Sequence, residues 1–197
     1  MEREKALEIV KAHLTEHRYT HTVGVMETAI LLAKKYGQNK EKAELAAIFH
    51  DYAKFRPKDE MKDLLLQQQI AVDMLDYGDE LLHAPCGAYL VKQEVGIDDE
   101  EVLQAIESHT TGRPNMTMLE KIIFISDYIE PNRIFPGVEE VRQVTFQDID
   151  EGILMSIKNT VTFLMKKNQL VYPGTLATYN EMVQSRQNKR RVKNDGK

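Results

Sequence analysis

The chain has 197 residues, of which 42% are hydrophobic and only 7% aromatic, with no Trp, ten Gly and six Pro. A chain of this length is one compact domain by default, and its low Gly, Pro and aromatic content favours helices over a strand-and-turn architecture. The formal net charge of -5 argues against a general nucleic-acid binder, which needs clustered Lys and Arg. We therefore expect an all-α, single-domain protein.

The cysteine content and the absence of long apolar runs indicate in which cellular compartment we expect the protein. Cys86 is the single cysteine and has no CxxC partner, so we expect a packed thiol rather than a disulfide or a nucleophile. The first residues lack the apolar core of a signal peptide. No uninterrupted apolar run exceeds five residues, as in 29–33, so we expect no membrane span and a soluble, cytoplasmic protein.

Apolar residues repeat every three or four positions along most of the chain, which predicts helices. The predicted helices cover, in order, residues 7–14, 23–33, 40–49, 61–69, 84–95, 99–109, 117–127, 146–167 and 175 onward. Segment 73–83 is mixed and predicts a turn or a short helix. We divide the chain into a domain over 1–185 and a basic tail over 186–197, which we expect to be disordered.

His50 and Asp51 stand side by side at the end of a predicted helix and offer a divalent metal one nitrogen and one oxygen ligand. His21 upstream and Asp127 downstream each lie at the polar edge of an amphipathic segment. Together the four residues give two nitrogen and two oxygen ligands, unlike the sulfur-rich sets of structural zinc. This set suits iron, manganese or another divalent ion with open positions for water, and it points to a metal-dependent phosphohydrolase.

Three histidines, His13, His17 and His21, repeat at steps of four and would share one face of a continuous helix. Only one of them is needed as a ligand. We choose His21 because Arg18 stands three residues before it, where a guanidinium could hold a phosphate beside the metal. We expect His13 and His17 to be exposed or partly buried helix residues.

The ligand set suits hydrolysis of phosphate esters and anhydrides. A bound metal lowers the pKa of water from about 15.7 toward about 7, so that metal-bound hydroxide is available to attack phosphorus near neutral pH. Lys54, three residues after Asp51, would lie one helical turn away if the helix continued, and it would stabilise the developing charge. Arg133 is a second phosphate candidate because it is tethered close to Asp127.

His83 and His109 both fall at predicted helix ends, where a bundle presents side chains into a shared mouth. Each could bind a second metal, donate to phosphate or protonate a leaving group. Thr110 to Arg113 follow directly and offer hydroxyls and a guanidinium for an anion pocket.

Six short motifs carry a resemblance to a known family. They are RYTH at 18–21, HDYAK at 50–54, HA at 83–84, HTTG at 109–112, SDYIEPNR at 126–133 and LVYPGT at 170–175. With these motifs the chain resembles the YqeK family of HD-domain proteins over most of its length. The resemblance implies an all-helical HD bundle and a bacterial symmetrical bis(5'-nucleosyl)-tetraphosphatase, which cuts diadenosine tetraphosphate into two ADP with iron.

The resemblance also implies roles for individual residues. The implied metal ligands are His21, His50, Asp51 and Asp127. The implied phosphate contacts are Arg18, Lys54, His83, His109, Thr110 and Arg133, with Asp51 and Asp127 also facing the substrate. The implied nucleoside turn consists of Leu170, Val171, Tyr172, Pro173, Gly174 and Thr175. We assign catalytic roles to Asp51, Lys54, His83 and His109, and homodimerisation is a family-level expectation.

Two matters stay open at this point. His83 and His109 would ligate a second metal in a binuclear HD protein but contact phosphate in a mononuclear one. The rival functions are another HD phosphohydrolase, such as a nucleotidase or a dNTP triphosphohydrolase, and a nucleotide-sensing interaction module without turnover. The intact ligand set, together with Lys54, favours an enzyme over the sensing module.

Overall fold

A computed structural model describes residues 1–195. Within this range the chain forms ten α-helices and three short 3-10 or π-helical segments, and it contains no strand, so the prediction of an all-α fold is confirmed. The α-helices are α1 (Arg3–Lys11), α2 (Glu16–Lys35), α3 (Lys40–Phe49), α4 (Lys58–Gln68), α5 (His83–Leu90), α6 (Glu100–Ser108), α7 (Met118–Ile129), α8 (Val138–Thr145), α9 (Ile149–Lys166) and α10 (Pro173–Asp195). The short segments are η1 (Val72–Asp76), η2 (Asp79–Leu81) and η3 (Val91–Val95).

Polar side chains define where most of the site-bearing helices begin. Thr15, Asn39 and Asp99 accept hydrogen bonds from backbone N–H groups in the first turns of α2, α3 and α6. Thr117 forms a reciprocal capping box with Glu120 at the start of α7. These caps satisfy backbone donors that a helix leaves without partners, so they determine which residues reach each helix end.

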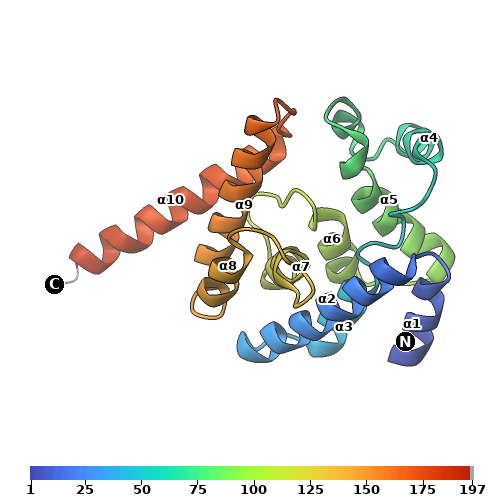
Figure 1. The fold of residues 1–197 in the computed structure, drawn as a ribbon, viewed down its shortest axis with the longest axis horizontal. Coiled ribbons are helices and arrows are strands. Elements are labelled where there is room, and N and C mark those ends of the chain that lie inside the picture. Colours follow the sequence, from blue (N-terminus) through green and yellow to red (C-terminus); the bar gives the residue numbers. More distant parts are fainter. Residues whose placement is uncertain (196–197) are drawn as a thin grey trace.

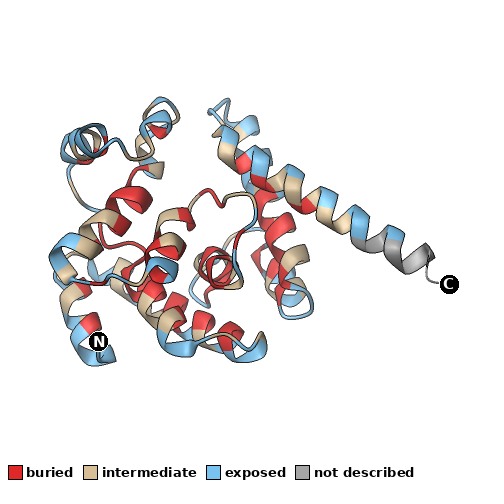
Figure 2. Cartoon of the chain, turned by 180° about the vertical axis from the view of Figure 1, so that it is seen from behind, coloured by how far each residue is buried: buried red, intermediate tan, exposed pale blue. Residues whose placement is uncertain are grey.

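Helix α7 lies in the middle of the bundle and packs against α2, α3, α6, α8 and α9 (Figure 1). Its Ile122, Ile123 and Ile125 are completely buried, as is Phe49 at the end of α3. Figure 2 shows buried residues gathered on the inner faces of the central helices. Each buried aliphatic side chain contributes roughly 1.5–3 kcal/mol, so the packed interior holds α2, α3, α6 and α7 at fixed positions.

Several predicted helices differ in their ends from those observed. The helix predicted for 84–95 is α-helical only to Leu90 and π-helical from Val91 to Val95. The predicted helix 7–14 ends at Lys11, and α2 begins at Glu16, so His13 does not share a helix face with His21. The helix predicted from residue 146 begins at Ile149, where the Asp148 carboxylate caps it. Helix α8 was not predicted, although Val138, Val141 and Val144 repeat every three residues along it. The short helices η1 and η2 agree with the turn predicted for 73–83.

The end of the chain also differs from the expectation. Helix α10 extends away from the bundle (Figure 1) and continues to Asp195, past the boundary at residue 185, so the structure describes a helix where we expected a disordered tail. Arg186 pairs with Glu151 of α9, with Nε 2.6 Å from Oε1. Residues 196–197 lie outside the described range, and the division of the chain at 185 stays a prediction. Among residues 1–195, no helix is long and apolar enough to cross a membrane.

Gly152 allows α9 to pack closely on α8, which predicts that its replacement destabilises the fold. A Cβ at this position would overlap Thr145 Oγ1 and lie 2.9 Å from Thr145 Cα. We expect Gly152→Ala to lower the free energy of unfolding by about 1–3 kcal/mol, as measured by urea denaturation. Gly87→Ala is the matched control, because a Cβ there meets its neighbours only at 3.7 Å or more. Equal stability of the two variants would contradict the proposed close packing.

Candidate metal centre

Three buried histidines present the same ring nitrogen to one centre. In His50, His83 and His109, Nδ1 lies 2.7, 2.8 and 2.7 Å from the backbone carbonyl oxygen three residues earlier. A neutral ring donates its hydrogen to that carbonyl, so Nδ1 carries the hydrogen and Nε2 keeps its lone pair. This is the arrangement in which a histidine is oriented as a metal ligand.

Asp51 lies between the histidines and has no exposed surface. Its Oδ2 lies 3.0 Å from Nε2 of His50 and contacts the guanidinium of Arg18. Its Oδ1 lies 3.1 Å from Nε2 of His83 and 3.9 Å from Nε2 of His109. The two oxygens of one carboxylate therefore face two different groups of nitrogen ligands.

His21 and Asp127 complete the first of these groups. His21 Nε2 lies 2.9 Å from Asp127 Oδ1 and 3.8 Å from Asp51 Oδ2. His50 Nε2 lies 3.9 Å from Asp127 Oδ1. The four residues predicted as ligands thus converge from α2, from the end of α3 and from α7. Their role as ligands stays a prediction, which the geometry supports.

Two overlapping groups of residues can hold a divalent cation. In one group, ligand atoms of His21, His50 and Asp51 all lie within 4.8 Å of one another, and in the other those of Asp51, His83 and His109 do. Within the described chain, both oxygens of Asp51 and the Nε2 atoms of His21 and His50 are buried without hydrogen-bond partners. Such atoms cost roughly 1–3 kcal/mol each, so this donor set fits a bound divalent metal.

The charge states of the carboxylates suit a cation. Burial raises the pKa of Asp51, but His50 and His83 outweigh this effect and hold the pKa well below its usual range. For Asp127, burial is again outweighed, here by the contact with His21 and the charge of Arg133, so its pKa is also well below the usual range. Both carboxylates are therefore anionic at neutral pH.

His83 and His109 face each other with their Nε2 atoms 3.2 Å apart. Burial lowers the pKa of His109 to about 3, so its Nε2 offers a lone pair at neutral pH. Because both Nδ1 atoms face carbonyl oxygens, two lone pairs would meet unless a proton or a cation lies between them. This contact is compatible with both predicted roles, a second metal and a phosphate contact.

The predicted phosphate-binding residues line one pocket of about 310 Å³. Its lining residues are Arg18, Lys54, Glu80, His83, His109, Thr110, Phe124, Asp127, Tyr128, Arg133 and Thr160. The hydroxyl of Thr110 is buried without a hydrogen-bond partner in the described chain, which suits a phosphate contact. All six predicted phosphate contacts therefore border one cavity, and their roles in binding stay predictions.

Lys54 reaches the pocket by a different route from the one we expected. Helix α3 ends at Phe49, so Lys54 does not lie one helical turn from Asp51. Instead a tight turn brings the backbone N–H of Lys54 within 2.9 Å of the carbonyl oxygen of Asp51. Its ammonium group lies 3.1 Å from Glu80 Oε2. The turn thus brings Lys54 close to Asp51, as we had expected a continuing helix to do.

Other predicted residues lie outside the phosphate pocket. His13 is half-buried against the ring of Tyr52, with 4.4 Å between ring centroids, and His17 is exposed. Both therefore agree with the expectation for residues that are not ligands. Arg113 is committed to Glu120, with Nε 2.6 Å from Oε1, so it is not free to bind an anion. Cys86 is buried, which raises its thiol pKa to about 12 and agrees with a packed side chain.

The predicted nucleoside turn, residues 170–175, is not part of the pocket lining. It meets η1 instead, where the hydroxyl of Tyr172 donates to Asp73 Oδ2 over 2.7 Å. The Tyr172 ring also lies edge-on to Tyr77, with 5.4 Å between centroids. The turn therefore contacts the segment that leads into η2 and Glu80, and its binding of a nucleoside stays a prediction.

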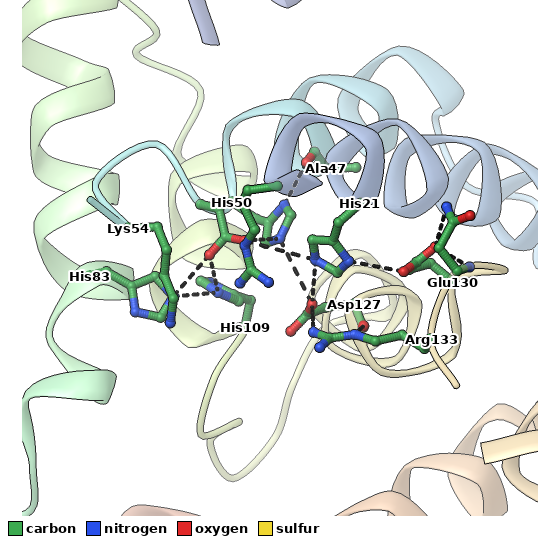
Figure 3. A network of polar contacts seen from close by, with 12 residues as sticks. His21, Ala47, His50, Lys54, His83, His109, Asp127, Glu130 and Arg133 are labelled. Atoms are coloured by element: carbon green, nitrogen blue, oxygen red, sulfur yellow. Dashed lines mark hydrogen bonds and ion pairs between the residues drawn. The ribbon is translucent and has the colours of Figure 1, made fainter. Parts of the chain in front are cut away.

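Sequence reasoning missed Glu130, which is buried behind His21 (Figure 3). Its Oε1 lies 3.1 Å from His21 Nδ1. Sequence reasoning also missed four residues of the pocket lining, Glu80, Phe124, Tyr128 and Thr160. Of these, Tyr128 and Glu130 carried a usable signal, because both stand in the same motif as Asp127.

Comparisons with known proteins agree with this geometry. The HD domain family matches residues 18–132. A Halalkalibacterium halodurans protein, 67% identical over 93% of this chain and 98% of its own length, is named "Bis(5'-nucleosyl)-tetraphosphatase, symmetrical". A Bacillus subtilis protein of the same name is 59% identical over the same shares of both chains.

A solved structure from Clostridium acetobutylicum is also similar. It is described as a predicted HD superfamily hydrolase involved in NAD metabolism, and it is 40% identical to this chain with a TM-score of 0.89. The match covers 94% of this chain and 98% of that one. The chain therefore belongs to the HD-domain family and, within it, to the YqeK family of symmetrical bis(5'-nucleosyl)-tetraphosphatases.

Proposed function

We propose that this protein hydrolyses diadenosine tetraphosphate and related dinucleoside polyphosphates symmetrically, giving two ADP from the adenosine compound. The observation that carries the proposal is a buried His/Asp centre bordered by a pocket that contains Arg18, Lys54 and Arg133. Relatives that are 44–67% identical over at least 90% of this chain bear the name of that activity.

The metal in this proposal is bound by His21, His50, Asp51 and Asp127. We propose iron, although manganese or another divalent ion also suits two nitrogen and two oxygen ligands. When bound, such an ion supplies an activated water near neutral pH and polarises phosphate oxygens. Asp51 Oδ1 faces His83 and His109. The proposal therefore also allows a second metal, bound by these three residues.

The cationic side chains suit cleavage in the middle of a polyphosphate. Figure 3 shows Lys54 and His83 on one side of the centre and Arg133 on the other. Arg133 is held by Asp127, with Nη2 2.7 Å from Oδ1 and Nε donating to the Asp127 carbonyl over 3.0 Å. Cations on both sides can neutralise charge on both diphosphate halves, which symmetric cleavage produces together. In this scheme Arg18, next to Asp51, orients the reacting phosphate.

We also propose that the protein acts in the cytoplasm as a homodimer, as the family resemblance implies. Size-exclusion chromatography with light scattering tests the oligomeric state.

A panel of nucleotides separates symmetrical hydrolysis of dinucleoside tetraphosphates from the activity of other HD phosphohydrolases. Faster cleavage of monophosphates than of dinucleoside tetraphosphates would favour the rival.

Hydrolysis in oxygen-18 water tests the position of cleavage. We expect one labelled and one unlabelled ADP from each diadenosine tetraphosphate, because water attacks a phosphorus next to the central bridging oxygen. Mass spectrometry of the products distinguishes the outcomes. Label in AMP or ATP would show asymmetric cleavage and would contradict the proposed function.

Removal of a proposed ligand should remove the metal and the activity together. We expect His50→Ala and Asp51→Ala each to lower metal content and turnover by more than about 10²-fold, as measured by elemental analysis and by ADP release. His17→Ala is the control, because this histidine is exposed on α2. Full metal content in Asp51→Ala would place the metal elsewhere.

Loss of Lys54 should weaken catalysis but not metal binding. Lys54→Met removes a pocket cation without touching a proposed ligand, so we expect kcat/KM for diadenosine tetraphosphate to fall about 10²-fold with metal content unchanged. Lys62→Met is the matched control, because Lys62 pairs with Asp79 at the surface. If both variants lost the same activity, the charge of Lys54 would have no special role.

A further inference from the structure

His21 differs from the other three histidines of the centre in how its outer nitrogen is held. Each of those three donates from Nδ1 to a backbone carbonyl, whereas His21 Nδ1 faces a carboxylate oxygen, Glu130 Oε1, at 3.1 Å. Glu130 is only 1% exposed. A buried carboxylate is expensive unless its oxygens are satisfied, so the partners of this group indicate what it does.

All polar partners of the Glu130 carboxylate can be donors. Oε1 faces His21 Nδ1, while Oε2 accepts the backbone N–H of Asn132 over 2.6 Å and its side-chain amide over 3.0 Å. The carboxylate presents an acceptor oxygen to each of these donors, whereas an amide in its place would turn an NH₂ group toward one of them. Glu130 therefore holds the hydrogen of His21 on Nδ1 and leaves the Nε2 lone pair directed at Asp51 and Asp127.

The fold makes room for this carboxylate on one side. Gly24 lies on α2, one turn after His21, and a Cβ at this position would overlap Glu130 Oε2 and lie 3.2 Å from Asn132 Nδ2. Any larger residue would push the carboxylate away from the imidazole. The glycine thus lets α2 and the end of α7 approach closely enough for the contact between His21 and Glu130.

A second helix holds the backbone of Glu130 from the other side. Arg142 of α8 donates to the carbonyl oxygens of Ile129, Glu130 and Arg133, over 2.7, 2.8 and 2.8 Å. One guanidinium therefore holds the turn that carries both Glu130 and Arg133. The position of the carboxylate is set by α2, α7 and α8 together.

We propose that Glu130 is a positioning residue of the metal centre, which orients His21 and fixes its tautomer for metal binding. The inference rests on the proposed role of His21 as a ligand. A ligand histidine that donates to a carboxylate is held in orientation and is a stronger electron donor, and loss of such a partner costs about 10–100-fold in metal affinity.

Titration of the metal-free protein with Mn²⁺ or Fe²⁺, without nucleotide, tests this role by calorimetry. We expect Glu130→Gln to raise the metal dissociation constant about 10–100-fold, with the helical circular dichroism of the metal-free protein unchanged and turnover recovering at saturating metal. Glu139→Gln is the matched control, because Glu139 also pairs with Arg142 but is an exposed surface residue. A dissociation constant within twofold of the wild-type value in Glu130→Gln would overturn the proposal.

If Glu130→Gln does not fold, Gly24→Ala tests the same proposal. Its added Cβ on α2 would push the Glu130 carboxylate away from His21. We expect Gly24→Ala to weaken metal binding as well. If both single variants fold, we expect their double variant to show less than the product of the two single effects. Unchanged metal affinity in Gly24→Ala would count against the proposal. Metal binding that weakens as expected in a protein that cleaves no dinucleoside polyphosphate would refute the proposed function alone.

Discussion

The buried carboxylate of Asp51 is the group on which the rest of the centre depends. Removing an ionised carboxylate from water costs several kcal/mol even after the protein relaxes, and Asp51 has no exposed surface. Arg18 and His50 face one of its oxygens, and His83 and His109 face the other. A cation bound between these groups would offset the remaining cost, which explains why the surrounding rings all turn their lone pairs inward.

The helical bundle delivers these groups from its helix ends. His50 and His109 follow directly after α3 and α6, and their rings fold back onto carbonyls of their own helices. That local contact orients each ring without help from the rest of the protein. His21 lies within α2, and its Nδ1 faces Glu130 at the end of α7 rather than a carbonyl of its own helix. The arginine of α8, Arg142, then ties this turn to the position of Arg133.

Local patterns predicted the fold class, most helices and the residues that converge at the centre. The His50–Asp51 doublet at a helix end was informative because the period of the helix placed it at the polar edge of the core. The contact between His21 and Glu130 joins residues 109 positions apart, so the role of Glu130 escaped prediction although it stands in the same motif as Asp127. The turn at Lys54 was missed, and the break predicted between residues 14 and 23 lies between Lys11 and Glu16, because periodicity alone does not resolve how the chain ends a helix.

Anomalous X-ray diffraction from crystals of the freshly purified protein would locate the metal relative to Asp51. If the account is right, data on either side of the iron edge will show a peak bounded by His21, His50, Asp51 and Asp127. A second peak between His83 and His109 would mean that Asp51 bridges two metals. The account is contradicted if the metal in these crystals, whatever its identity, lies away from Asp51.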